Sequence, residues 1–397
     1  MVRRSTLGVG ALVAAASTGH VLYPAWLAVA SRRRRTAQVS DPAEWPAVTV
    51  LVAAYAEAQC IGPKVHDVLA NGYPGPLEVM VVADADVETA ARAEHAGATV
   101  VTADDRLGKA QAINLGLSKV TAPFVVLTDA NNVLAPGAIA ALIRHFGDPR
   151  VGAVAGEKVE ADGGGEDLYW RFESWLKQRE WRLGTTIGLV GELAAVRTDT
   201  WRPIPADVSI DDLWIALDLS ERGYAIAYEP SAKAFEPPEH TMGQQWERRT
   251  RSVANALHVF QQRRALLGPS GGLVAAEVWG HRLARYTVSP IAQAVLLGLA
   301  ARRARSSRLA KLFLLGHGIG VWTLARRAAS ERGAPSQTAV PADGPASSDA
   351  SDASDASVAG RVGQALGQGV FLQAVAVGGM VRYLRGDRPT RWTTVRR

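Results

Sequence analysis

The 397-residue chain has only one cysteine, Cys60, which excludes any intrachain disulfide and fits a reducing compartment. It also lacks an internal repeat with the long period of a solenoid. Its eight histidines are not spaced as metal ligands. GVGAL near Gly8 lies inside an apolar segment with no strand before it, so it is not a dinucleotide-binding loop. GLVGELAA, at 188–195, contains no serine that could act as a nucleophile.

Charged residues are absent between Leu7 and Ala30, a run long enough to span a bilayer as a helix. A cleaved signal peptide is the other interpretation, because AVA before Ser31 resembles a cleavage site. However, the run is too long for the apolar region of a signal peptide, and the arginines at 32–35 are of the kind that stays in the cytoplasm. We therefore expect a transmembrane anchor over residues 1–35, with the next domain in the cytoplasm.

The net charge of +6 and the pI near 9.6 are values also found in nucleic-acid-binding proteins. Here the excess lies in clusters beside apolar segments, as in a protein that faces an anionic cytoplasmic leaflet. We therefore predict the lipid bilayer as a partner and no nucleic acid. The clusters are 32–35, RRARSSR at 302–308, Arg326 with Arg327, and the tail RYLRGDRPTRWTTVRR at 382–397.

Residues 46–262 have the pattern of a soluble α/β domain. Four short apolar runs without alternation predict parallel strands covered on both faces: VTVLVAA, LEVMVVA, ATVVTA and PFVVLT. Helix-length segments at 57–70, 87–96 and 108–119 separate them, which predicts a doubly wound, Rossmann-like sheet. Ligands collect at the carboxyl ends of such strands. Asp84, Asp86, Asp129 and Asn131 fall at these ends and are candidates for one shared crevice.

Beyond residue 262 the chain consists of apolar segments divided by arginines. We expect interfacial and transmembrane helices over 263–332, and a transmembrane helix with a basic tail over 358–397. The Pro-, Ser- and Ala-rich acidic segment 333–357 cannot bury enough apolar surface to fold, so we predict a disordered loop. Candidate membrane helices are 284–301, 309–325 and 363–381. If 284–301 lies in the interface, 302–308 and the tail stay cytoplasmic while the acidic loop goes outside; a fourth crossing would expel the tail.

Two pairs of polar residues compete as a metal site. A nucleoside diphosphate in the crevice would need a divalent cation, and Mg²⁺ and Mn²⁺ prefer oxygen ligands. Asp129 and Asn131 form one pair, and Asp84 and Asp86 form the other, with two full charges. A plain turn is also open, because Asp and Asn hydrogen-bond their own backbone.

Four stretches occur in the order found in family 2 glycosyltransferases with a GT-A fold, and the chain resembles that family. The stretches are VLVAAYAEAQCI, LEVMVVADAD, RLGKAQAINLGL and FVVLTDANN. Ala56 stands where the family customarily has Asn. The resemblance implies a nucleotide-diphospho-sugar transferase domain with these roles: Ala54, Tyr55 and Glu57 in the nucleotide-binding turn, Asp84 as the base-reading aspartate, Lys109 near the phosphates, and Asp129 with Asn131 as ligands of Mg²⁺ or Mn²⁺. Asp86 is then a turn residue.

Later stretches resemble the acceptor side of the same family. In SIDDLWIALDLSERGYAIAYEPSA, at 209–232, the resemblance implies that Asp212 is the general base, beside Asp211. A positioned carboxylate takes the proton of an acceptor hydroxyl and makes it a nucleophile. Capping of the following helix is the alternative for these two acids. GTTIGLVGELAAVR, at 184–197, looks like the acceptor-side strand, with Glu192 as a candidate contact.

The last family signal departs from its usual form. QQWERRTRSVANAL, at 244–257, keeps Arg248 and Arg251, which suit diphosphate oxygens. It lacks the family's Gln and Trp, and this puts processive polymer synthesis in doubt. A basic face near the membrane is the alternative for the arginines. VGGMVRYLRGDRPTRWTTVRR, at 377–397, resembles the tail of many membrane-bound members.

The expected protein is a multi-pass, membrane-bound inverting glycosyltransferase of polysaccharide or glycoconjugate biosynthesis. It transfers a sugar from a nucleotide-sugar, with a UDP-sugar as the expected donor, to a hydroxyl of a carbohydrate or lipid-linked acceptor. The alternative is a noncatalytic sugar-nucleotide-binding scaffold of a membrane glycan-assembly complex, suggested by Ala56, Asn131 and the altered arginine motif. The presence of Asp84, Asp129 and Asp212 together argues against it. Donor sugar, linkage and oligomeric state are left open.

Overall fold

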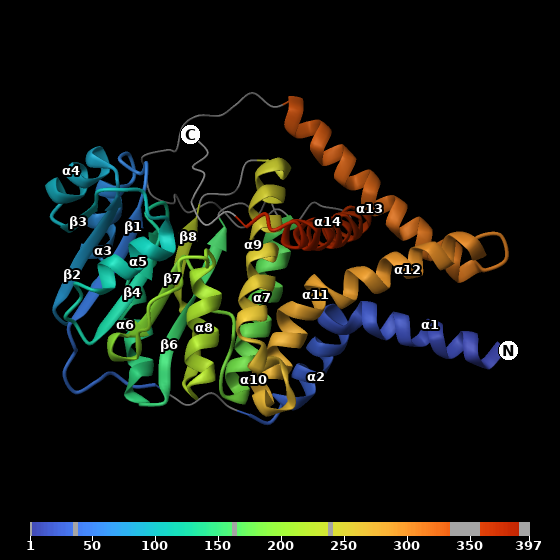
Figure 1. The fold of residues 1–397 in the computed structure, drawn as a ribbon, viewed down its shortest axis with the longest axis horizontal. Helices are drawn as coiled ribbons and strands as arrows, with labels where there is room; N and C mark the ends of the chain where they lie inside the picture. Colours follow the sequence, from blue (N-terminus) through green and yellow to red (C-terminus); the bar gives the residue numbers. More distant parts are fainter. Residues whose placement is uncertain (1, 35–38, 161–164, 237–240, 334–357, 389–397) are drawn as a thin grey trace.

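A single mixed sheet forms the centre of the computed structural model, which describes residues 2–34, 39–160, 165–236, 241–333 and 358–388. The strand order is β3-β2-β1-β4-β7-β6-β8-β5 (Figure 1). The first four strands are parallel, as predicted: β1 (Val48–Ala54), β2 (Leu77–Asp84), β3 (Thr99–Ala103) and β4 (Phe124–Thr128). Every residue of β1 and β4 is buried, because these runs of β-branched and aliphatic residues are covered on both faces.

The second half of the sheet departs from the predicted parallel pattern. Strand β7 (Leu193–Arg197) runs antiparallel to β4 and pairs Leu193 with Thr128. Strand β6 (Val151–Glu160) runs antiparallel to β7 and parallel to β8 (Ala225–Glu236), and β5 (Val133–Leu134) closes the edge. Because β7 enters in the reverse direction, the residue before it, Glu192, lies beside the carboxyl end of β4.

Two layers of helices cover the sheet. Helices α5 (Lys109–Leu117), α8 (Asp211–Glu221) and α9 (Met242–Gln262) pack in one apolar cluster with Leu51, Val82 and Leu127. The other cluster contains residues of α3 (Ile61–Leu69), α4 (Val87–His95) and α6 (Ala138–Ile143). The helices predicted at 57–70, 87–96 and 108–119 are therefore present, with shorter bounds. Short 3-10 helices are η2 (Arg144–Gly147), η3 (Thr198–Thr200), η4 (Arg264–Leu267) and η5 (Pro269–Gly271).

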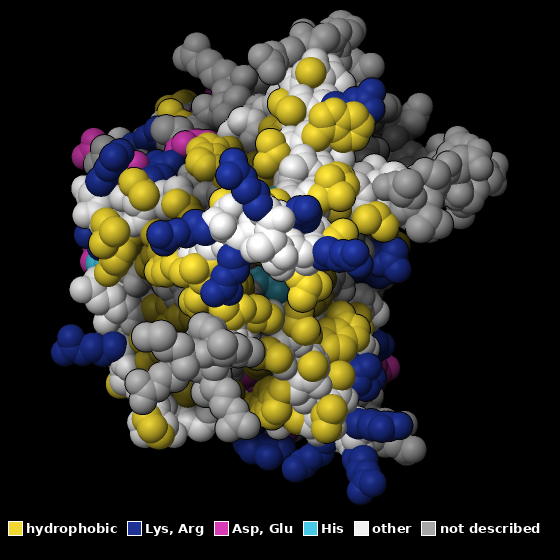
Figure 2. Space-filling view, turned by 90° about the vertical axis from the view of Figure 1, so that its right-hand side faces the viewer, with side chains coloured by type: hydrophobic (Ala, Val, Ile, Leu, Met, Phe, Trp, Pro, Cys, Tyr) yellow, Lys and Arg dark blue, Asp and Glu magenta, His cyan; other side chains and the backbone are white. Residues whose placement is uncertain are grey.

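The remaining helices gather beside the sheet, and several project away from it (Figure 1). The view from that side shows apolar side chains interspersed with Lys and Arg, and few acidic ones (Figure 2). These elements are α1 (Val2–Ser17), η1 (Thr18–Leu22), α2 (Tyr23–Ala30), α7 (Gly165–Leu183), α10 (Gly272–Glu277), η6 (Val278–Leu283), α11 (Ala284–Tyr286), α12 (Val288–Arg303), α13 (Arg308–Gly333) and α14 (Val358–Leu384).

Within the described residues, two helical segments are long and apolar enough to cross a membrane, Gly8–Ala30 and Val362–Leu384. A third candidate is the pair Pro269–Tyr286 and Val288–Arg303, which is bent by 43°. The predicted span 284–301 falls in this bent pair. The predicted span 309–325 lies in α13, which is not among the candidates. The loop predicted at 333–357 lies, apart from Gly333, outside the described residues.

A buried ionic network ties the first apolar segment to the domain that contains the sheet. The Tyr23 hydroxyl donates to Glu180 Oε1 over 2.7 Å, and His281 lies between two carboxylates, with Nδ1 2.8 Å from Glu180 and Nε2 2.8 Å from Glu173. Arg285 Nη1 donates to Glu173 over 2.7 Å. Because carboxylates only accept, both His281 nitrogens donate and the imidazole is charged. The network joins α2, α7 and the bent pair at one point.

Candidate active site

The strand register brings the predicted site residues to one edge of the sheet. Ala54 pairs with Ala83, so Tyr55 and Asp84 follow at the same level. Val52 pairs with Thr128, so Asp129 leaves β4 beside them. The carboxyl ends of β1, β2 and β4 therefore form the expected crevice.

The turn after β1 has an unusual backbone. Ala56 has φ 56° and Ala85 has φ 55°, in the left-handed region that costs a non-glycine residue about 1–2 kcal/mol. Asn tolerates this region better than Ala, which accounts for the customary Asn at the Ala56 position. Here the Ala56 amide donates to Asp86 Oδ2 over 2.7 Å, and this bond holds the turn.

Asp86 connects the two turns of the crevice. Besides Ala56, it accepts from the Thr89 amide over 3.1 Å and from the Thr89 hydroxyl over 2.5 Å. Burial acts to raise its pKa, but the bonds from Thr89 and Ala56 outweigh burial and hold the pKa of Asp86 below its ordinary value. Asp86 therefore does more than form its own turn. It caps α4, and it also fixes the turn after β1.

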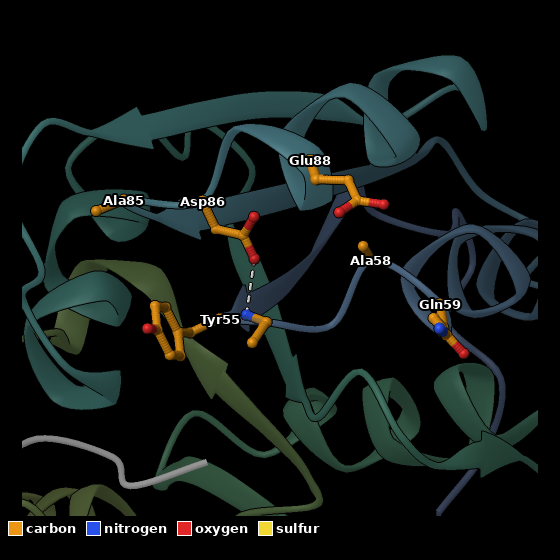
Figure 3. Close-up of a pocket in the computed structure, with 7 residues that line it drawn as sticks. Tyr55, Ala58, Gln59, Ala85, Asp86 and Glu88 are labelled. Atoms are coloured by element: carbon orange, nitrogen blue, oxygen red, sulfur yellow. Dashed lines mark hydrogen bonds between the residues drawn. The ribbon is translucent and has the colours of Figure 1, made fainter. Parts of the chain in front are cut away.

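A cavity of about 380 Å³ opens at these turns (Figure 3). The Arg106 guanidinium stacks 3.5 Å above the centre of the Tyr55 ring beside it. Stacking surfaces and hydrogen-bonding groups of this kind suit a nucleoside. The cavity is lined by Tyr55, Ala56, Ala58, Gln59, Ala85, Asp86 and Glu88.

Asp84 is fully buried and is not among the residues that line this cavity. Its Oδ1 accepts from the Leu107 amide over 2.6 Å and its Oδ2 from the Gly108 amide over 2.9 Å. Gly108 has φ 85°, a conformation for which glycine is suited, and α5 begins at the next residue. Asp84 therefore sets where Lys109 enters the crevice; its base-reading role stays a prediction.

The Asp86→Ala variant should bind nucleotide about tenfold more weakly yet keep its response to metal. Hydrogen bonds to a charged acceptor contribute about 1.5–3 kcal/mol when buried and less at a partly exposed site. Calorimetric titration with UDP and GDP, with and without Mn²⁺, measures both effects. Glu88→Gln is the matched control, since Glu88 lines the same cavity but has a 69% exposed side chain, paired with Arg92. Loss of the metal response in Asp86→Ala would show that the wrong pair was assigned to the metal.

The Asp129 carboxylate is paired with Lys109 in this structure. Lys109 Nζ lies 2.5 Å from Asp129 Oδ1. Burial acts to lower the pKa of Lys109, but Asp129 and then Asp211 raise it above its ordinary value. The ammonium is therefore charged and neutralises Asp129.

Asn131 presents a carbonyl oxygen next to this pair. Its Nδ2 donates to Glu236 Oε1 over 3.2 Å, which leaves Oδ1 as an acceptor. Carboxylate and amide oxygens fit a hard divalent cation. No group of three His, Cys, Asp or Glu side chains with metal-binding geometry occurs among the described residues. Asp129 and Asn131 would thus hold a metal together with phosphate oxygens of the donor, as Mg²⁺ is often held.

Asp212 lies in the first turn of α8. Its Oδ1 accepts from the Leu213 amide over 2.8 Å, while Ile210 at the N-cap makes no side-chain cap. Burial and then the like charge of Asp211 raise the pKa of Asp212 to about 6, although Arg282 opposes the shift. A carboxylate with this pKa is suited to accept a proton near neutral pH.

Lys109 and Asp212 both approach Gly191. A Cβ added there would lie 3.7 Å from Lys109 Nζ and 4.0 Å from Asp212 Cβ. The lysine assigned to the donor phosphates and the carboxylate assigned as base are therefore neighbours of the same glycine.

Lys158, on β6, is a site residue that the sequence analysis did not identify. Its Nζ lies 2.9 Å from Glu192 Oε1, pairs with Glu236 as well, and lies 4.8 Å from the centre of the Trp170 ring. Burial acts to raise the pKa of Glu192, but Lys158, and then Arg248, lower it to about 2. The one available signal was a lysine in an otherwise buried strand, VGAVAGEKVE. Arg251 follows Arg248 on the same helix, α9.

Comparisons with known proteins show the family of the chain. A sequence profile described as "Glycosyltransferase like family 2" matches residues 46–255. The chain is 26% identical over 226 residues to poly-beta-1,6-N-acetyl-D-glucosamine synthase of Staphylococcus aureus (strain COL). This match covers 52% of this chain and 54% of that protein. The Staphylococcus epidermidis protein of the same name is 23% identical over 219 residues. The chain thus spans about half the length of the curated relatives it matches.

One solved structure resembles the chain over most of its length. It is mannosyltransferase PcManGT from Pyrobaculum calidifontis in complex with GDP-Man and Mn²⁺, with a TM-score of 0.68 and 25% sequence identity. The match covers 95% of this chain and 97% of that one. It confirms the GT-A fold, and it includes the helices that flank the sheet.

Proposed function

Because the chain belongs to the family 2-like glycosyltransferases and is itself a glycosyltransferase, we propose that it is a membrane-bound inverting enzyme that transfers a sugar from a nucleotide-sugar to an acceptor hydroxyl. The observation that carries the proposal is that Lys109, which is paired with Asp129, and Asp212 both approach Gly191. A single displacement needs groups for the leaving diphosphate and a base for the acceptor hydroxyl at one centre, because the nucleophile attacks the anomeric carbon as the diphosphate departs.

In the proposed reaction Asp212 accepts the proton of the acceptor hydroxyl. The hydroxyl oxygen then forms a bond to the anomeric carbon, while the bond from that carbon to the diphosphate oxygen breaks. A divalent metal at Asp129 and Asn131, when bound, would supply positive charge for the departing diphosphate. Lys109 adds a fixed charge on the same side, and Arg248 and Arg251 are the further candidates for contact with the diphosphate.

The donor is proposed from two sources. The sequence favoured a UDP-sugar, and the relatives named as poly-beta-1,6-N-acetyl-D-glucosamine synthases support a hexosamine donor and a carbohydrate acceptor. The similar mannosyltransferase structure holds GDP-Man and Mn²⁺, which makes GDP-mannose the second donor to test. The purified full chain with Mn²⁺ or Mg²⁺ should turn over one of a panel of UDP- and GDP-sugars. Binding without turnover for every donor and acceptor would favour the noncatalytic scaffold.

We further propose that the catalytic domain is cytoplasmic and that α1 and the bent pair cross the membrane side by side. Helix α1 packs along α12, and the basic stretch 302–308 lies at the same end of the molecule as the N-terminus (Figure 1). The arginines at 32–34 hold the opposite end in the cytoplasm. This arrangement differs from the one in which 284–301 lies in the interface and 302–308 stays cytoplasmic, because the four arginines of 302–308 now lie outside.

Cysteine labelling of intact cells tests the arrangement in a Cys60→Ser background. Ser306→Cys, exposed at the turn between α12 and α13, should react with an impermeant reagent. Ser118→Cys, exposed on the catalytic domain, should react only after lysis. Protection of Ser306→Cys would return 284–301 to the interface, and labelling of Ser118→Cys would place the catalytic domain outside.

A further inference from the structure

Lys158 connects the metal side and the acceptor side of the site. Its side chain is only 1% exposed, and its ammonium lies between Glu192, which precedes β7, and Glu236, at the end of β8. We propose, on the basis of the proposed function, that Lys158 is a positioning residue: through Glu236 it orients Asn131 toward the metal, and through Glu192 it fixes a carboxylate beside the acceptor.

The metal-side relay consists of two contacts. Lys158 pairs with Glu236 Oε2, and the other oxygen of that carboxylate accepts from Asn131 Nδ2 over 3.2 Å. The second contact holds the amide nitrogen against Glu236 and so turns Oδ1 away from that carboxylate. If the amide rotated, a donor group would face the metal instead of an acceptor. Partners of metal ligands commonly set ligand orientation in this way.

The acceptor-side contact uses the same ammonium. Glu192 Oε1 lies 2.9 Å from Lys158 Nζ, while the Glu192 backbone carbonyl accepts from Thr128 over 2.9 Å and from Asn132 over 3.0 Å. Both ends of Glu192 are therefore held, one by Lys158 and the other by the metal-side strand end. Its carboxylate cannot move without changing its contact with Lys158.

The charge balance explains why a cation is needed here. Two carboxylates close to each other and shielded from water repel strongly unless a cation lies between them. Loss of the Lys158 charge would drive Glu236 and Glu192 apart, and Asn131 would lose the contact that orients its amide group. The relay also predicts that Asn131→Asp weakens the metal site, because the new carboxylate would face Glu236.

Lys177 provides a matched control. It is 3% exposed, its Nζ lies 3.0 Å from Glu157 Oε2, and it lies 4.6 Å from the centre of the Tyr228 ring. Like Lys158 it is buried, pairs with a carboxylate and lies over an aromatic ring, but the hydrogen bonds of its carboxylate partner go to Ser174, Lys177 and Tyr228 and not to Asn131.

The test compares Lys158→Met and Lys177→Met in the full chain in detergent, with folding checked by circular dichroism. Mn²⁺ affinity is measured by electron paramagnetic resonance at saturating UDP or GDP, and nucleotide affinity by calorimetry without metal. Lys158→Met should bind Mn²⁺ about 10- to 100-fold more weakly, as expected for the partner of a metal ligand, with metal-free nucleotide affinity unchanged. Lys177→Met should bind Mn²⁺ with an affinity within about threefold of the wild-type value, as expected for a substitution outside the site.

A double variant tests whether Lys158 acts through Asn131. If it does, Lys158→Met combined with Asn131→Ala should bind Mn²⁺ no more weakly than Asn131→Ala alone. Additive losses, or wild-type affinity in Lys158→Met, would overturn the relay. If Lys158→Met does not fold, Glu236→Ala tests the same contact and should show the same loss. Failure of the wild-type chain to bind nucleotide with Mn²⁺ would instead contradict the proposed function.

Discussion

The Asp212→Asn variant should bind nucleotide-sugar with wild-type affinity in the presence of metal and transfer almost none of it. Asp212 has no assigned role in donor binding, so its replacement leaves the pair of Lys109 and Asp129 in place. Removal of a general base lowers the rate by roughly 10²- to 10⁴-fold. Asparagine keeps the shape of the side chain and its acceptor for the Leu213 amide, so the start of α8 should be preserved.

Calorimetry for binding and product analysis for transfer measure the two parts of this expectation. An active Asp212→Asn enzyme, or one that no longer binds nucleotide, would remove Asp212 from the role of base. Asp211→Asn is the control, since Asp211 lies in the same first turn of α8. This substitution should lower the rate of transfer less than Asp212→Asn does.

The pH profile gives an independent check on the same residue. With the pKa of Asp212 raised to about 6, the carboxylate form needed for proton acceptance is present above that pH and is lost below it. Transfer should therefore fall about tenfold per pH unit below 6, once a single ionisation controls the rate. Asp211→Asn removes the like charge that helps raise the pKa, so its profile should shift toward acid. An unshifted profile would mean that another group controls the rate.

The Asp129→Ala variant should lose the stimulation of nucleotide binding by Mn²⁺ or Mg²⁺. Asp129 is the one charged side chain of the assigned metal pair. We therefore expect the affinity for the metal to fall by more than the roughly 100-fold that is the upper range when a partner of a metal ligand is removed. Metal-free nucleotide binding should not weaken, because Lys109 is released from its 2.5 Å contact with Asp129 and becomes available to the phosphates.

Nucleotide titrations with and without metal, on Asp129→Ala and Asp86→Ala in parallel, decide between the two acidic pairs of the crevice. An equal loss of the metal response in both variants would refute the choice of Asp129. A metal response retained by Asp129→Ala would show that the metal is held elsewhere.

The amino-acid sequence by itself determined the parallel half of the sheet and the residues at its edge. Apolar runs such as VTVLVAA and PFVVLT have enough length and β-branching to predict buried strands, and the positions of Asp84, Asp129 and Asn131 just after them follow from chain order alone. The order of the motifs likewise indicated the family before any contact was known. These features are local, since each depends on residues that are neighbours in the chain.

Tertiary structure alone decided which site residues form ion pairs or hydrogen bonds with each other. Lys158, Glu192 and Glu236 meet because β7 runs antiparallel between β4 and β6, and nothing in the spacing of these residues predicts that reversal. Asp86 likewise acquires its second role through the Ala56 amide, 30 residues away in the chain. The bend between Tyr286 and Val288 also appears only in the folded chain. Pairings of this kind depend on strand order and register, which are set by the packing of the whole core and not by any local pattern.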